Sequence, residues 1–147
     1  MRQPPDAIAL VTALLELDPD VMDRDELAAG TSQIAQLKAW CDALQVRYTR
    51  RTRELAAQGR SEAPRDLIAK HGGETGKGAR DAAEREQVCT TMPNFEDALA
   101  TGSVSAGHVD AISHATKGLD QPALAEFRSH ADNLLADAGI CVSDQGL

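Results

Sequence analysis

The apolar residues of this chain follow a seven-residue repeat over residues 23–58. The repeat consists of Leu27, Ile34, Cys41, Tyr48 and Leu55, with Leu37 and Leu44 three positions after two of them. Such a repeat places apolar side chains in one stripe along a helix that packs against its neighbours at a shallow angle. Asp23 and Glu26 form a capping-box pattern at the start, and Gly59 follows the end. We predict one long helix over residues 23–58, with the stripe facing the core and Leu37 and Leu44 buried.

Shorter helices are predicted over the rest of the chain. Their expected ranges are about 6–17, 64–71, 79–92, 94–101, 105–117 and 120–138. Capping residues, prolines and glycines separate these ranges. In the first helix we expect an inward face of Ile8, Val11 and either Leu14 or Leu15, and in the last helix the inward residues include Leu134. The predicted fold is all-α: a single domain over residues 1–147, an irregular multi-helix bundle built on the long helix.

Composition agrees with this class. The chain is rich in alanine, and only 3% of its residues are aromatic. Its longest apolar run is too short to cross a bilayer, and no signal-peptide pattern is visible, so we expect a cytoplasmic protein without a membrane partner. Cys41, Cys89 and Cys141 are odd in number and far apart, which argues against a disulfide framework or a zinc-binding pair. We interpret all three as buried structural thiols.

Charge is unevenly spread along the chain. The net charge is −8, yet residues 31–70 are basic while both flanking segments are acidic. The acidic balance argues against strong non-specific DNA binding. The densest positive charge is Arg47, Arg50, Arg51 and Arg53 on two adjoining faces of the long helix. This cluster is either a solvated helix end that complements the helix dipole or a patch that contacts DNA phosphates.

Two other candidate sites, a phosphate-binding loop and a histidine metal site, lack the residue spacing that such sites require. The glycine-rich stretch 72–78 lacks both the phosphate-loop spacing and its hydroxyl residue, so we interpret it as a connector between helices. His108 and His114 stand six apart, which is not a metal-ligand spacing on a helix, and no carboxylate is placed by sequence to complete a site with them or with His130. We expect surface or capping histidines, no metal, no cofactor, no small-molecule ligand and no catalytic site.

Residues 95–116 have the outline of a helix-turn-helix, with a glycine turn at Gly102. The second helix, however, contains no arginine to bind guanine and no asparagine or glutamine to bind adenine. A structural corner between two helices is the favoured interpretation, and a DNA-reading head is the alternative.

Several segments together resemble a known family. They are Ala79, Met92-Pro93, residues 98–105 (Ala-Leu-Ala-Thr-Gly-Ser-Val-Ser), His108-Val109, Ile112, Ala115, residues 134–138 and the long helix with Leu37, Leu44 and its arginines. Across about residues 20–137 the chain is similar to domain of unknown function 222, an actinobacterial domain usually found N-terminal to an HNH endonuclease domain. A second similarity, to the helix-turn-helix of ParB-type partition proteins, covers only residues 99–112.

The chain also departs from that family. Glu86 stands where the family helix usually carries alanine, and the glycine-rich loop is longer. The paired histidines, the asparagine and the C-x-x-C pairs of the HNH domain are absent from residues 1–147, so the chain looks like a truncated form, and we expect no nuclease activity. The resemblance implies a non-catalytic accessory domain of such a nuclease, and our leading hypothesis is that it assists DNA binding, with phosphate contacts from Arg47, Arg50, Arg51 and Arg53. The alternative is a protein–protein module that forms a homodimer through the long helix and does not contact nucleic acid.

Overall fold

The computed structural model describes residues 6–137 of the chain, and within this range every regular element is a helix. The elements are α1 (Ala7–Leu15), a 3₁₀ turn η1 (Pro19–Val21), α2 (Arg24–Ala57), α3 (Pro64–His71), α4 (Gly76–Thr91), α5 (Pro93–Ala100), α6 (Ala106–Thr116) and α7 (Gln121–Asp137). The all-α prediction is confirmed, and the long helix lies where the heptad pattern places it.

Side-chain capping explains most helix starts. The Asp23 carboxylate accepts a hydrogen bond from the Glu26 backbone N–H at 2.8 Å, and the Glu26 carboxylate accepts from the Asp23 N–H at 3.1 Å, which is the expected capping box. The largest boundary error is at α4, which begins at Gly76 instead of residue 79, and α1 ends at Leu15, two residues before its predicted end. Thr75 Oγ1 accepts from the backbone N–H of Gly78 at 3.0 Å, so the end of the glycine-rich stretch forms the first helical turn.

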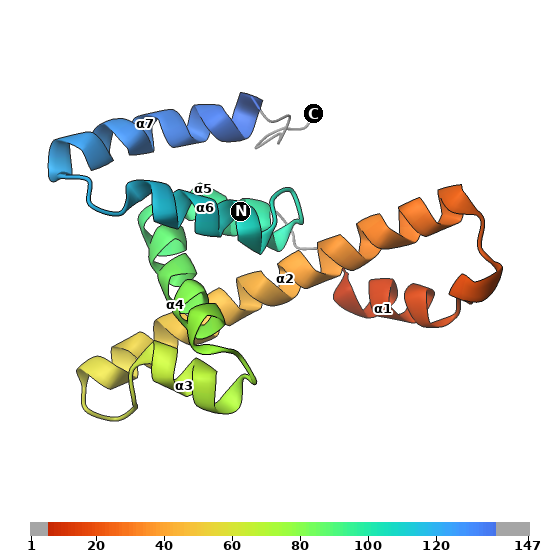
Figure 1. The fold of residues 1–147 in the computed structure, drawn as a ribbon, viewed down its shortest axis with the longest axis horizontal. Helices are drawn as coiled ribbons and strands as arrows, with labels where there is room; N and C mark the ends of the chain where they lie inside the picture. Colours follow the sequence, from red (N-terminus) through yellow and green to blue (C-terminus); the bar gives the residue numbers. More distant parts are fainter. Residues whose placement is uncertain (1–5, 138–147) are drawn as a thin grey trace.

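The molecule consists of a body and a projecting arm (Figure 1). Helix α2 runs through both parts. The arm is residues 7–35, in which α1 folds back along the N-terminal half of α2. The body is residues 36–137, in which α4 and α5 pack on the C-terminal half of α2, and α3 and α6 pack on α4. The first body residue already contacts another element, because Gln36 Nε2 donates to the Thr101 carbonyl at 3.3 Å.

The main core lies between α2, α4, α5, α6 and α7. Its buried side chains are Ala39, Ala43, Val46, Val88, Cys89, Phe95, Ala98, Leu99, Val104, Val109, Ala131 and Leu135. A smaller cluster of Ile68, Ala79 and Ala82 joins α3 to α4. Two small residues of α2, Ala39 and Ala43, are four positions apart, and small side chains on one helix face allow a neighbouring helix to approach closely.

The heptad stripe does not face this core, so that prediction was wrong. Leu27, Ile34 and Tyr48 are 44%, 49% and 68% exposed, and Cys41 is exposed as well. At about 100° per residue, Cys41 and Ala43 point about 200° apart around the helix axis. The core therefore occupies the face of α2 opposite the stripe.

Several residues expected to be buried are more exposed than predicted. Leu37 and Leu44, expected to be buried, are half-buried. On α1 the expected inward residues Ile8, Val11 and Leu15 are exposed, and Leu14 is half-buried. Of the thiols expected to be buried, Cys89 is buried and Cys41 is not; Cys141 lies outside the described residues, and the side chain of Leu134 is not described.

None of the helices in residues 6–137 combines the length and the apolar character that a membrane span requires.

Candidate interaction surfaces

Arg50 is one of the four predicted phosphate-binding residues. Its side chain faces the body and contacts carboxylates of two other helices. Its guanidinium forms a bidentate contact with Glu96 of α5, and its Nε donates to Thr90 Oγ1 at 3.1 Å and lies 3.9 Å from Glu86 Oε2. The hydrogen bond to Glu96 is the main reason why the pKa of Arg50 is raised above its ordinary value. Arg50 therefore joins α2 to α4 and α5.

Arg53 is engaged in the same way. Its Nε lies 2.6 Å from Glu86 Oε1, and its Nη2 donates to the Ala83 carbonyl at 3.1 Å. Glu86 is buried on α4 and also accepts a hydrogen bond from Thr90 Oγ1. Glu86 is therefore the buried partner of two arginines.

The two remaining arginines of the cluster are exposed. Arg51 Nη1 lies 3.0 Å from Glu54 Oε2 on the same helix. Arg47 has no ion pair with the residues that the structure describes. Within residues 6–137, only Arg47 and Arg51 of the cluster therefore lack a carboxylate partner on another helix and remain available for phosphate contacts. The sequence could not show this, because Glu86 and Glu96 are distant from the arginines along the chain.

A buried arginine that the sequence analysis missed lies at the centre of the body. Arg85 of α4 makes two 2.8 Å hydrogen bonds to the carboxylate of Asp110 on α6, and its Nη1 lies 3.9 Å from Asp42 on α2. Burial lowers the pKa of Arg85, but the Asp110 contact outweighs it and raises that pKa overall. Burial raises the pKa of Asp42. This network ties three helices together and is structural.

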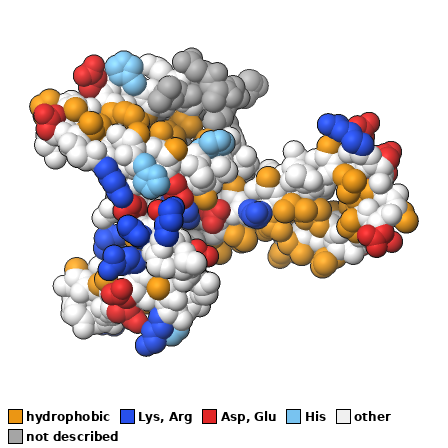
Figure 2. Space-filling view, viewed as in Figure 1, with side chains coloured by type: hydrophobic (Ala, Val, Ile, Leu, Met, Phe, Trp, Pro, Cys, Tyr) orange, Lys and Arg blue, Asp and Glu red, His pale blue; other side chains and the backbone are white. Residues whose placement is uncertain are grey.

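Most of the exposed large apolar side chains among the described residues lie on the arm. Its exposed large apolar side chains are Ile8, Val11, Leu15, Leu17, Val21, Leu27 and Ile34. Figure 2 shows apolar atoms gathered along the arm. Eight of the nine residues of α1 are apolar, yet none of them is buried. A helix that is apolar on all sides is normally buried, so the arm is an incomplete packing unit.

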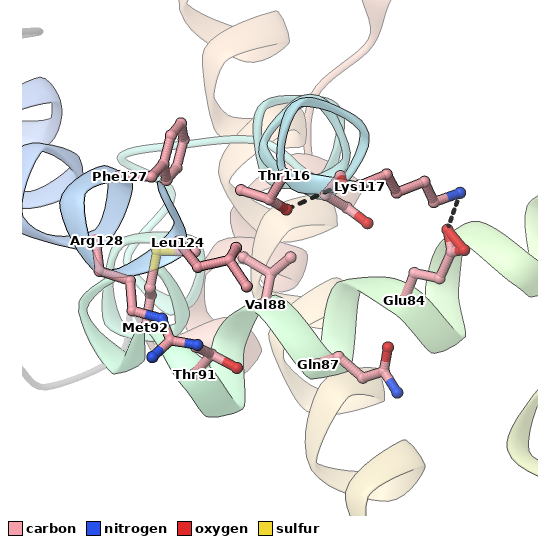
Figure 3. Close-up of a pocket in the computed structure, with 11 residues that line it drawn as sticks. Glu84, Gln87, Val88, Thr91, Met92, Thr116, Lys117, Leu124, Phe127 and Arg128 are labelled. Atoms are coloured by element: carbon pink, nitrogen blue, oxygen red, sulfur yellow. Dashed lines mark hydrogen bonds and ion pairs between the residues drawn. The ribbon is translucent and has the colours of Figure 1, made fainter. Parts of the chain in front are cut away.

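A pocket of about 260 Å³ lies between α4, α6 and α7 (Figure 3). Val88, Met92, Leu124 and Phe127 form its apolar part. At its edge Lys117 Nζ lies 2.9 Å from Glu84 Oε1. The pocket is smaller than the range typical of small-molecule sites. We assign it no ligand.

The histidines divide into two groups. His108 caps α6 as expected: its Nδ1 accepts from the Ser105 backbone N–H at 3.1 Å. His114 differs, because its Nε2 lies 3.6 Å from Asp81 Oδ1. His114 is exposed, as expected for a surface histidine, but the fold places beside it a carboxylate that the sequence did not indicate.

Comparison of the chain with protein-family models, curated proteins and solved structures gives no match. The similarity to domain of unknown function 222 stays a prediction. The candidate surfaces are therefore interpreted from their geometry alone.

Proposed function

We propose that this chain is a protein–protein interaction module that pairs with a second copy of itself through the arm. The observation that carries the proposal is the unburied apolar helix α1 beside the exposed heptad residues Leu27 and Ile34. Two helices can bury only one face of each against the other. If each hairpin packs against α2 of the other copy, the outer apolar faces become a core.

Charge along α2 favours an antiparallel arrangement of the two copies. The N-terminal end of α2 carries Asp23, Asp25 and Glu26, whereas the C-terminal half exposes Arg47 and Arg51. In an antiparallel pair each acidic end lies beside the basic half of the other copy. Opposite charges flanking a heptad seam determine the orientation of paired helices. Arg47 and Arg51, which have no partner on another described helix of their own chain, would thus contact acidic residues of the second copy.

The heptad positions also supply a register. With Leu27 opposite Leu44 and Ile34 opposite Leu37 of the second copy, the first and fourth positions of the heptad alternate across the seam, as in antiparallel coiled coils. The same register places Arg47 beside Glu26 of the second copy. Apolar packing and charge therefore agree on one alignment.

Analytical ultracentrifugation of Ile34→Glu tests the proposal. We expect the unmodified chain to be a dimer and Ile34→Glu to be a monomer with unchanged helix content, because a charge would be placed in the apolar seam. Ala35→Glu is the matched control, since Ala35 is exposed and lies one residue away from the stripe. A monomeric unmodified chain, or a dimer that survives Ile34→Glu, would show the proposal to be wrong.

Cysteine cross-linking tests the orientation. In the antiparallel register Cys41 lies opposite Gly30 of the second copy, whereas in a parallel pair Cys41 would lie opposite Cys41. A Cβ atom at Gly30 would meet no atom within 4 Å, so Gly30→Cys fits the fold. In a Cys141→Ser background, we expect a disulfide-linked dimer for Gly30→Cys and much less for Cys41 alone. Efficient cross-linking through Cys41 alone would indicate parallel helices.

The accessory role implied by the family resemblance is compatible with this module. A domain that pairs through its arm would bring two associated chains together without a catalytic group of its own. Direct DNA contact through Arg47, Arg50, Arg51 and Arg53 is the less supported alternative, because Arg50 and Arg53 are already bound by carboxylates of the body.

A further inference from the structure

The contact between α4 and α6 brings together three potential metal ligands. Asp81 and Glu84 stand three residues apart on α4, which places them on one face of the helix, and His114 reaches them from α6. One ligand atom from each of the three residues lies within 4.8 Å of the other two. The sequence did not show this set, because the carboxylates and the imidazole are far apart along the chain.

The surroundings of the three side chains are ordered. Arg85 directly follows Glu84 and makes two 2.8 Å hydrogen bonds to Asp110, four residues before His114. This bidentate pair fixes the spacing of α4 and α6 next to the ligands. Ligands on packed helices are held more precisely than ligands on loops.

Two lysines now neutralise the carboxylates. Lys77 Nζ lies 2.8 Å from Asp81 Oδ2, and Lys117 Nζ lies 2.9 Å from Glu84 Oε1. The contact of Lys117 lacks hydrogen-bond geometry, so the buried Glu84 Oε1 has no hydrogen-bond partner. Both lysine side chains are more than half exposed and can turn into solvent (Figure 3 shows Lys117 and Glu84). A divalent cation would replace two single positive charges, and the local charge balance would be unchanged.

We propose that Asp81, Glu84 and His114 bind a divalent transition-metal cation of the zinc class at the contact between α4 and α6. The imidazole favours zinc, cobalt or nickel over magnesium and calcium, which prefer oxygen ligands alone. Three protein ligands leave one position of a tetrahedral zinc ion for water. Metal–ligand bonds of about 2.1 Å require the ligand atoms to approach to roughly 3.4 Å of one another, which side-chain rotation can supply.

Such an ion would link α4 to α6 directly. It would add a metal bridge beside the Arg85–Asp110 pair and would stabilise the body without changing the arm. The inference is independent of self-association, because none of the three ligands belongs to the arm or to α2.

Isothermal titration of the metal-stripped chain with zinc chloride tests the site, with thermal unfolding as a second readout. We expect one zinc ion per chain and a higher melting temperature with zinc. His114→Ala and Asp81→Asn should each weaken binding by about tenfold or more, because each removes a ligand. His130→Ala is the matched control, since His130 is exposed on α7 and its Nδ1 contacts the Glu126 carbonyl. Circular dichroism checks that each variant is folded.

The Lys117→Ala variant distinguishes a metal site from a purely structural ion pair between Lys117 and Glu84. Removal of the competing ammonium should strengthen zinc binding, while the stability of the zinc-free chain should stay the same or fall. Absence of zinc binding by the unmodified chain would overturn the proposal. So would zinc binding that persists unchanged in both His114→Ala and Asp81→Asn, because the ion would then be bound elsewhere.

Discussion

Arg53 Nε lies 2.6 Å from Glu86 Oε1, and this contact joins a partly exposed base to a carboxylate that is only 3% exposed. The two residues are 33 positions apart, on α2 and α4. A buried carboxylate needs a positive or hydrogen-bonding partner. Arg53 therefore stabilises the contact between two helices of the body.

Arg53→Ala should destabilise the fold more than Arg51→Ala. Loss of Arg53 leaves Glu86 with Arg50 at 3.9 Å and with Thr90, so we expect a loss of about 1–3 kcal/mol in the free energy of unfolding. Arg51 is the matched control: it contacts only Glu54 at the surface, and its loss should cost less than about 0.5 kcal/mol. Urea denaturation near neutral pH measures both. Equal losses would indicate that water replaces Arg53 at Glu86.

Gly102→Ala should destabilise the chain more than Gly118→Ala. Both glycines have a positive φ, +78° and +80°, where a side chain is strained by about 1–2 kcal/mol. At Gly102 a new Cβ would also lie 2.7 Å from Gln36 Cγ and 3.1 Å from its Cα, whereas at Gly118 it would meet no atom within 4 Å. Thermal unfolding of the two variants separates the clash from the backbone strain. A larger loss for Gly118→Ala would contradict the close approach of α2 to the turn before α6.

Cys89 should be protected from alkylation, and Cys41 should react. Burial raises the pKa of the Cys89 thiol to about 12, so the reactive thiolate is scarce at mildly alkaline pH, and the side chain is also enclosed. Cys41 is exposed on the heptad stripe. Iodoacetamide labelling followed by peptide mass spectrometry measures each site. Equal labelling of both thiols in the native chain would mean that the body opens readily, and full labelling of both after denaturation is the control.

The chain should not bind duplex DNA measurably at low salt. Arg50 and Arg53 are occupied by Glu96 and Glu86, and the net charge of −8 opposes approach to phosphates. Fluorescence anisotropy with a labelled duplex measures this. Binding with a log–log salt slope of about −3.6, reduced by about two when Arg47 and Arg51 are both replaced by alanine, would instead support four phosphate contacts.

The sequence by itself determined where the helices are. Asp23 with Glu26, Pro64, Ser105 and Asp120 act on backbone groups within one turn, so their effect can be predicted without knowledge of the fold. The spacing of apolar residues likewise established an all-α chain with one long helix. The start of α4 was missed because a threonine cap allowed glycines into the first turn.

Only the tertiary structure decided which face of each helix is buried. The heptad repeat emphasises large residues such as Ile34 and Tyr48, whereas the body packs on the small residues Ala39 and Ala43, which allow a closer approach of α4 and α5. The partners of Arg50 and Arg53, and the approach of His114 to Asp81, are likewise contacts between separate helices. Spacing within one helix cannot predict such contacts, because they depend on how the helices are placed relative to one another.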